Sequence, residues 1–211
     1  MSLPDNSNPA GKPSLARLID RLSAHAKATR EEAAREIFTI GFARATECVS
    51  GWLADPEIAN CFVFGGQGTG PGFPRTTVGI AVEPGRFAQI RAANGSPRLA
   101  DVPSDLDAEE FEIRVGDTVS LDVLTTRDSE ADGAIARFLR KYGEGIQQVE
   151  LSVRSVDRAT QMLRERFGLA PVYPQARLGA NSTRVNFFLV SAPESGKLLV
   201  ELVEESAQRN F

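Results

Sequence analysis

The stretch that decides the fold runs over residues 143–204 and reads GEGIQQVELSVRSVDRATQMLRERFGLAPVYPQARLGANSTRVNFFLVSAPESGKLLVELVE. Residues 146–153 alternate in polarity, which predicts a half-buried strand. Gln148 and Glu150 share one face of this strand, and Gln147 lies on the other face together with three apolar residues. The strand is therefore expected to present a polar face opposite an apolar one.

A helix and two strong strands follow in the same stretch. Ser155 is a suitable N-cap, apolar residues recur after it at helical spacing, and Gly168 ends the helix. Strands are predicted over 184–190 and 197–204, on either side of a run of turn residues. Residues 172–173 and their neighbours can supply a weaker third strand. The predicted order is strand, helix and three strands.

The composition is that of a globular protein with one ordinary domain or two small modules that share a core. The net charge of −4 gives no electrostatic case for binding nucleic acid or an anionic membrane. The sequence has no apolar signal core at its N-terminus and no run of about 18 apolar residues. Cys48 and Cys61 are too few for a disulfide framework. We therefore expect a cytoplasmic protein with no membrane partner.

The first quarter of the chain is predicted to hold a tail and two helices. The polar tail, residues 1–13, is expected to be disordered. Helices are predicted over 14–55, where Ser14 caps the first and a capping box from Thr29 to Glu32 opens the second. We expect these helices to form an added cap on the domain or a dimerisation arm. A homodimer would form through them or through the edges of the modules.

A glycine-rich segment follows over 60–75 and reads NCFVFGGQGTGPGFPR. A phosphate-binding loop needs a helix N-terminus after its glycines, and a Walker loop also needs a lysine. Here Pro71, Pro74 and a further strand follow instead. A mobile loop over a pocket, or a surface loop, is therefore favoured for residues 65–72.

Two alternatives stay open for the region after the strand predicted at 76–82. Residues 83–86 form either a type II turn with 87–92 as a hairpin partner, or the start of a short helix with Pro84 at its first position. With the helix, the region is a degenerate first module that has a weak strand near 99–102 and ends in a hairpin over 111–124. The hairpin itself is well signalled. The two-module alternative is favoured because the hairpin falls where the first module ends in the family that the chain resembles, as set out in the next paragraph.

Two runs of residues carry a family resemblance. The run 135–149, IARFLRKYGEGIQQV, has GEGIQQ where methylmalonyl-CoA epimerases usually have GEGIHH, and the run 185–202, VNFFLVSAPESGKLLVEL, is similar to their closing strands. The chain thus resembles this family of the vicinal oxygen chelate (glyoxalase/bleomycin-resistance) superfamily. The resemblance implies an α+β fold of paired βαβββ modules that form an open cup-shaped sheet, here with an added N-terminal helical pair. The modules are expected over 60–130, in degenerate form, and 131–205.

The same resemblance implies a site inside the cup. The positions where the family holds a divalent metal correspond here to Thr77, Asp122, Gln148 and Glu201, although the family usually has histidine in place of Thr77 and Gln148. The one histidine of this chain, His25, falls on an N-terminal helix. Asp122, Gln148 and Glu201 form an oxygen-only set, which suits Mg²⁺ or Mn²⁺ better than Zn²⁺ or Ni²⁺. No tightly bound cofactor is expected, with weakly bound Mg or Mn as the alternative.

The expected chemistry is proton transfer by the two carboxylates Glu201 and Asp122. Epimerisation next to a thioester needs a base, an acid and a group that stabilises the enolate. The residues expected to bind the substrate are Gln148, Glu150, Asn186 and Thr77. The resemblance therefore predicts a small-molecule epimerase, isomerase or lyase for a carbonyl or acyl-CoA substrate. The alternative is a non-catalytic small-molecule-binding protein of the bleomycin-resistance kind.

Overall fold

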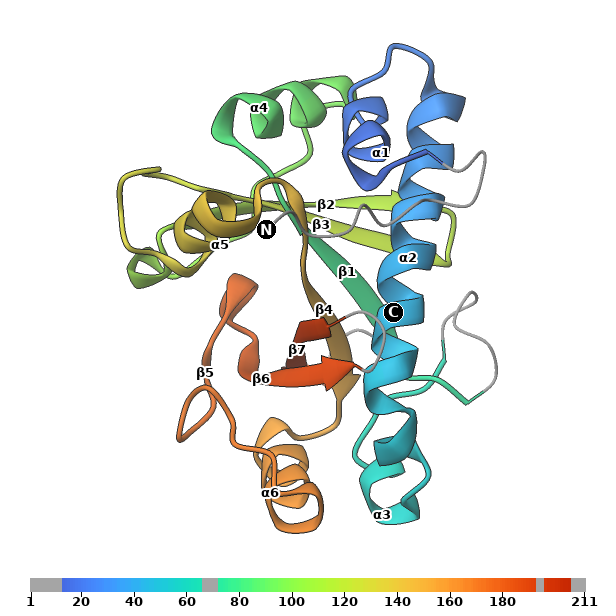
Figure 1. The fold of residues 1–211 in the computed structure, drawn as a ribbon, viewed down its shortest axis with the longest axis vertical. Coiled ribbons are helices and arrows are strands. Elements are labelled where there is room, and N and C mark those ends of the chain that lie inside the picture. The colour runs from blue at the N-terminus through green and yellow to red at the C-terminus, as the bar shows by residue number, and fades with distance from the viewer. Residues whose placement is uncertain (1–12, 66–71, 193–195, 206–211) are drawn as a thin grey trace, which may run out of the picture.

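The computed structural model describes residues 13–65, 72–192 and 196–205 of the chain. The predictions for the tail over 1–13 and for the loop over 65–72 lie almost wholly outside these residues. The helices are α1 (Leu15–Arg21), α2 (Lys27–Leu53), α3 (Pro56–Ala59), α4 (Pro84–Ala93), α5 (Ala134–Tyr142) and α6 (Val156–Phe167), with short 3₁₀ turns η1 (Ser104–Leu106) and η2 (Ala180–Ser182). The strands are β1 (Thr76–Ala81), β2 (Ala108–Val115), β3 (Val119–Thr126), β4 (Gly145–Val153), β5 (Arg177–Leu178), β6 (Arg184–Ala192) and β7 (Gly196–Glu204) (Figure 1).

All seven strands belong to one sheet, in the order β2-β3-β1-β4-β7-β6-β5. The central pair, β1 and β4, is antiparallel, and each of these strands has a parallel partner on its outer side, β3 for β1 and β7 for β4. The two halves of the sheet are thus related by an approximate repeat. The sheet curls into a half-barrel, so the predicted α+β fold with an open cup-shaped sheet and an N-terminal helical pair is confirmed.

The C-terminal half of the sheet contains the predicted order of strand, helix and three strands. Ser155 caps α6 through its side chain, which accepts from the backbone N–H of Arg158, and Gly168 ends the helix in the left-handed conformation. The weaker strand lies later than predicted. This strand is the two-residue β5. Residues 172–173 form no strand, although Val172 N donates a hydrogen bond to the carbonyl of Phe187.

The N-terminal half of the sheet decides between the two alternatives for residues 83–92. This segment is the helix α4, with Pro84 in its first turn, and no hairpin partner. The predicted hairpin is present as β2 and β3. Among the described residues, 99–102 form no strand, although Ala100 N donates to the carbonyl of Glu110 at 2.8 Å. This half therefore has one strand fewer than its counterpart.

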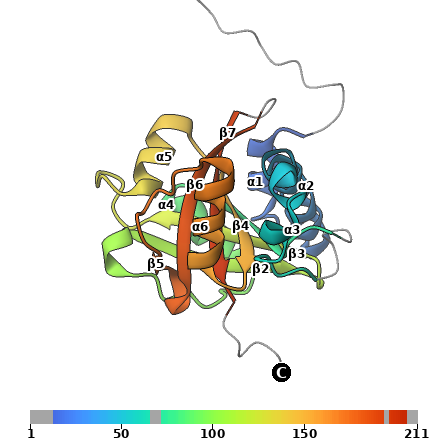
Figure 2. The same cartoon turned by 90° about the horizontal axis from the view of Figure 1, so that it is seen from below.

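The N-terminal helices are part of the main hydrophobic core. The buried face of α2 packs against the sheet together with α1, and Figure 2 shows α1, α2 and α3 on one side of the sheet and α5 on the other. Gly41 of α2 lies so close to β1 that an added Cβ would come within 2.5 Å of Val78 Cγ1. Helix α2 begins at Lys27 with no side-chain cap, so the capping box predicted at Thr29 is wrong.

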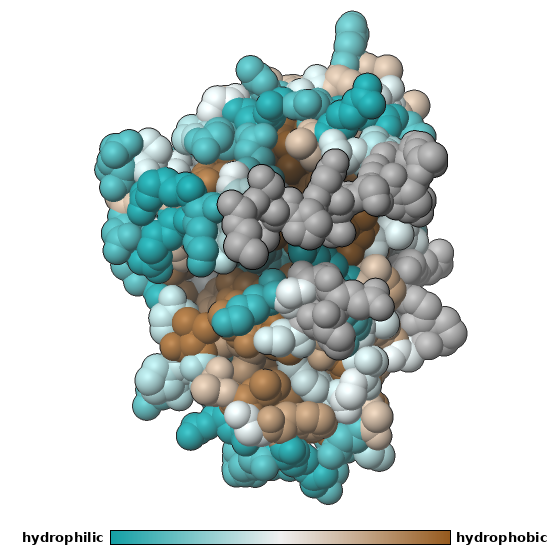
Figure 3. All heavy atoms as spheres, in the orientation of Figure 1, coloured by the Kyte–Doolittle hydropathy of each residue, from teal (hydrophilic) through white to brown (hydrophobic). Residues whose placement is uncertain are grey.

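The far edge of the sheet carries exposed apolar side chains. Val172, Leu178 and Leu189 are all at least half exposed, and hydrophobic surface is visible in this part of the molecule in Figure 3. An edge of this kind is compatible with the homodimer expected from the sequence, which stays a prediction. Within the residues described, no helix is long and apolar enough to span a bilayer.

Candidate active site

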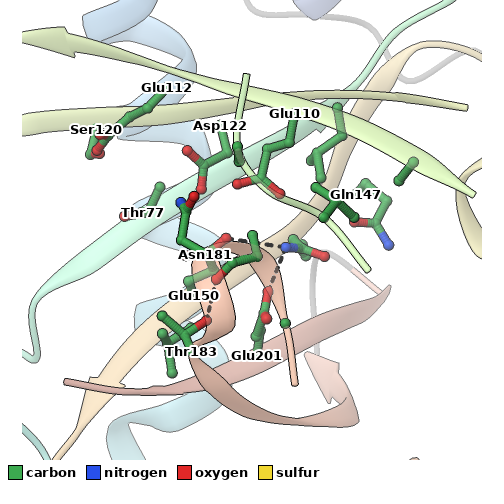
Figure 4. Close-up of a pocket in the computed structure, with 18 of the residues that line it drawn as sticks. Thr77, Glu110, Glu112, Ser120, Asp122, Gln147, Glu150, Asn181, Thr183 and Glu201 are labelled. Atoms are coloured by element: carbon green, nitrogen blue, oxygen red, sulfur yellow. Dashed lines mark hydrogen bonds between the residues drawn. The ribbon is translucent and has the colours of Figure 1, made fainter. Parts of the chain in front are cut away.

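The concave face of the sheet encloses a cavity of about 1010 Å³. Its floor is formed by the central strands of both halves, and its walls include η1, α5 and the η2 segment. Figure 4 shows that polar side chains of β2, β3, β4 and β7 point into this space. A cavity of this size can hold an organic molecule of the size of a drug or a metabolite.

A β-bulge in β4 turns two consecutive glutamines into the cavity. Gly79 of β1 is paired with Gln148, but the next residue, Ile80, is paired with Ile146, so Gln147 has no partner on β1. Strict alternation would have sent Gln147 to the core face, whereas both glutamines line the cavity. Both are buried, and Gln147 Oε1 has no hydrogen-bond donor among the described residues.

The side chain of Gln148 connects two carboxyl groups on the floor. Its Nε2 donates to Glu201 Oε2 at 2.6 Å and to Glu150 Oε1 at 3.2 Å. The opposite residue on β1 is Gly79, where an added Cβ would lie 2.7 Å from Gln148 Cγ. Glycine at this position therefore leaves the space in which the Gln148 side chain runs.

Four carboxyl groups lie together on the floor, and we call Glu110, Asp122, Glu150 and Glu201 the acidic floor. Burial raises the pKa of Asp122 and of Glu201 well above the ordinary values, and the negative charges of Glu150 and Glu110 raise both further. Burial also raises the pKa of Glu110, to about 8, with added repulsion from Glu150. Glu110 thus favours its protonated form near neutral pH, and the pKa values of Asp122 and Glu201 are shifted in the same direction.

Glu150 differs from its neighbours because it accepts their hydrogen bonds. Burial raises the pKa of Glu150 on balance, and hydrogen bonds from Asp122, Gln148 and Glu201 offset part of this rise. Asp122 and Glu201, by contrast, act as the protonated partners in their contacts with Glu150. The floor therefore holds carboxyl groups that titrate together and contact one another, an arrangement suited to proton transfer.

The structure brings together five of the six residues expected from the sequence. Thr77, Asp122, Gln148, Glu150 and Glu201 all line the cavity. Asn186 does not line it, contrary to its expected place in the cup. It is fully buried on the opposite face of β6, where its Nδ2 donates to Tyr173 O and its Oδ1 accepts from Phe187 N. Its amide holds the backbone before β5 in place.

Two residues of the site were missed by the sequence analysis. Glu110 precedes the position at which the hairpin was predicted to begin, and β2 in fact starts at Ala108. Residues two apart on a strand share a face, so with β2 extended back to Ala108 the alternation from Glu112 places Glu110 on the cup face. Gln147 reaches the cavity through the bulge, for which the sequence carries no signal. His25 lies exposed in the turn between α1 and α2, not on a helix as expected, and does not line the cavity.

The donor set of the floor is chemically suited to a hard cation but is not arranged around one. Oxygen ligands suit Mg²⁺ or Mn²⁺. However, the carboxyl groups are hydrogen-bonded to one another, and Gln148 directs its amide nitrogen, not its oxygen, toward two of them. Among the described residues, no three or more His, Cys, Asp or Glu side chains are grouped as a metal site would require.

The basic residues around the cavity lie away from the floor. Arg75, Arg98, Arg114 and Arg137 line the cavity and are all exposed. Three of them form ion pairs with carboxylates outside the floor: Arg75 with Glu205, Arg114 with Glu112 at 2.8 Å, and Arg137 with Asp132 at 3.4 Å. Within the described residues, the acidic floor makes no ion pair with any lysine, arginine or histidine.

The curled sheet, its central β1–β4 pair and the polar cup on its concave face define the class of fold, which is that of the vicinal oxygen chelate proteins. Several solved structures of similar fold are methylmalonyl-CoA epimerases. The enzyme from Mycobacterium tuberculosis is 28% identical, with a TM-score of 0.52 over 70% of this chain and 95% of that one.

Two further solved structures support the fold alone. A variant of the Streptomyces coelicolor methylmalonyl-CoA epimerase, in complex with 2-nitronate-propionyl-CoA, is 24% identical, with a TM-score of 0.50 over 64% of this chain and 96% of that one. A hypothetical protein from Bacillus halodurans C-125 is 23% identical, with the same TM-score and the same coverage of each chain. No protein-family model matches the sequence, and no curated protein matches it.

Proposed function

We propose that this protein is an isomerase of the epimerase type, which moves a proton on the carbon next to a carbonyl or thioester group. The observation that carries the proposal is the set of buried Asp122 and Glu201, with half-buried Glu150 between them and in contact with both, on the floor of a cavity large enough for an organic substrate. The similarity to the Mycobacterium tuberculosis epimerase supports an acyl-CoA as the substrate class.

The two carboxylic acids come from opposite halves of the sheet. Asp122 lies on β3, which flanks β1, and Glu201 lies on β7, which flanks β4. A carbon held above the central pair has one of these groups on each side. One group, once ionised, removes the proton from one face of the carbon, and the other returns a proton to the opposite face. This is the requirement of an epimerisation.

The remaining residues of the floor have supporting roles in this proposal. Glu150 is the ionised partner that exchanges protons with Asp122 and Glu201. Gln148 donates its amide N–H groups to Glu201 and Glu150 and so holds these two carboxyl groups in position for proton transfer. Thr77, which is paired with Glu150 across β1 and β4, bounds the same space. The proposed steps use these protein groups alone.

Hydrogen exchange tests this function directly. The protein is incubated in D₂O with a set of acyl-CoA thioesters and small ketones, and deuterium at the carbon next to the carbonyl is followed by mass spectrometry. We expect exchange on at least one thioester at a rate proportional to protein concentration. Thioesters that bind without any exchange would contradict catalysis and favour the alternative, a protein that binds a small molecule without turnover.

A further inference from the structure

The acidic floor and its surroundings also indicate which end of a ligand is buried. The side chain of Glu110, which is half-buried, makes no hydrogen bond or ion pair within the described residues, although it lines the cavity among three other carboxyl groups. Gln147 is only 8% exposed, and its Oε1 is fully buried with no donor in the same part of the chain. A buried acceptor without a donor, such as Gln147 Oε1, is rare and costs free energy in the unliganded protein.

Gln147 Oε1 is an acceptor, Glu110 accepts through both oxygens once it ionises next to a cation, and both side chains face the cavity. A ligand that completes them must therefore donate hydrogen bonds. The floor carries several carboxyl groups and no basic side chain, so a donor that also carries positive charge fits it best. A ligand carboxylate at the same depth would add a negative charge to the floor and would leave both acceptors unsatisfied.

The cavity next to these acceptors has an apolar wall. Leu124 of β3, Ile135 of α5, and Val102 and Leu106 near η1 all line it, and they belong to one small hydrophobic cluster. This wall suits a short carbon chain. The cavity of about 1010 Å³ also exceeds what a bare cation would fill, so the geometry favours an organic cation over a metal ion.

We infer that the cup takes a ligand whose buried end is an alkylammonium group, with its N–H donors directed at Glu110 and Gln147 Oε1 and its carbon chain against the apolar wall. The inference names a substrate class for the proposed function. It rests on that function only because both concern the same cup. It also distinguishes this chain from the proteins it resembles, because the methylmalonyl group in their name carries a carboxylate.

Three four-carbon probes of nearly equal shape test the inference: butylammonium, butyramide and butyrate. Each is titrated into the ¹⁵N-labelled full-length protein, and amide shifts are followed by NMR. We expect butylammonium to bind at least about tenfold more tightly than butyramide, as a charge-assisted hydrogen bond implies, and butyrate not to bind in the cup. Butyrate binding in the cup as tightly as butylammonium would overturn the inference.

Variants locate the binding group. Glu110→Gln and, independently, Gln147→Leu should each weaken butylammonium binding by about fivefold or more. Glu109→Gln is the matched control, because Glu109 precedes Glu110 on β2, faces the other side of the sheet and does not line the cavity. Unchanged binding in both cup variants, with folding verified by thermal unfolding, would overturn the inference. So would displacement of butylammonium by stoichiometric Mg²⁺ or Mn²⁺, which would make the floor a metal site.

The outcomes separate this inference from the proposed function. Butylammonium binding without deuterium exchange on any thioester would leave the alkylammonium inference standing and remove the isomerase. Exchange on a neutral or acidic thioester, together with no butylammonium binding, would overturn the inference alone.

Discussion

Gln148 Nε2 donates a 2.6 Å hydrogen bond to Glu201 Oε2 and so connects the first strand of the C-terminal module to its last. Gln148 and Glu201 are both buried, so this bond is shielded from water. It fixes the carboxyl group of Glu201 toward Glu150 and the centre of the cup. The position of Gln148 therefore decides how the acidic floor is assembled.

Gly79→Ala should disturb this position. The new Cβ would lie 2.7 Å from Gln148 Cγ and 3.0 Å from Leu124 Cδ1, so we expect a loss of about 1–3 kcal/mol in unfolding free energy and a shifted side-chain amide resonance for Gln148. Gly85→Ala in α4, where nothing lies within 4 Å, is the control and should leave that resonance unchanged. Equal stability and identical resonances in the two variants would contradict the packing described here.

Gly41→Ala tests whether the N-terminal helices belong to the core. Its Cβ would clash with Val78 on β1, whereas Gly51 on the same helix has nothing within 4 Å. In urea unfolding, Gly41→Ala should lose about 1–3 kcal/mol, and Gly51→Ala should gain up to about 1 kcal/mol from its helix propensity. If Gly41→Ala were as stable as Gly51→Ala, α2 would not be packed on the sheet as described.

The pH dependence of stability follows from the raised pKa values of the acidic floor. The pKa of Glu110 is about 8 in the folded protein against an ordinary value of 4.5, so between these values the folded state binds more protons than the unfolded state. Stability is then fully present below about pH 4.5 and falls as the pH rises toward 8. Asp122 and Glu201 contribute in the same direction.

The measurement is thermal unfolding of the native chain and of Glu110→Gln at pH 5.5 and pH 8. The variant, which cannot ionise, should be the more stable of the two at pH 8, on the order of 1 kcal/mol, and should show a flatter pH dependence. A native chain that becomes more stable from pH 5.5 to pH 8 would contradict the assigned protonation of the floor.

The sequence was most informative where alternation is regular. Gln148, Glu150 and Glu201 were placed on one face because β4 and β7 alternate around them, and all three line the cup. Gln147 is predicted on the other face because alternation alone does not reveal the bulge in β4. The bulge depends on how β4 pairs with β1, which is a long-range property. Helix α2 begins at Lys27, two residues before Thr29, with no side-chain cap, so the local capping pattern did not locate its start.

Asn186 shows a second limit of the sequence. Alternation along β6 requires Asn186 and Phe187 to face opposite sides, but it does not say which of them faces the cup. The register decides, because Phe187 is paired with Glu201 and therefore shares its face, while Asn186 is paired with the core residue Leu202. Register between strands is a tertiary property and could not be derived from one sequence.

The metal content of the purified protein tests the expectation of no tightly bound cofactor. The donors on the floor are oxygens, and neither cysteine nor the histidine lines the cavity in the described structure. We therefore expect elemental analysis after dialysis to find far less than one Zn, Ni or Co per chain. About one equivalent retained through dialysis would refute this, whereas weak Mg²⁺ or Mn²⁺ binding would not.

Deuterium exchange by Glu201→Gln tests the central claim, that the acidic floor transfers protons, most directly. Glutamine keeps the size of the side chain but can neither release nor return a proton. The rate of exchange on the best thioester should therefore fall about 100-fold or more, while Glu165→Gln on the exposed surface of α6 should exchange like the native chain. A folded Glu201→Gln protein that exchanges as fast as the native chain would contradict the claim.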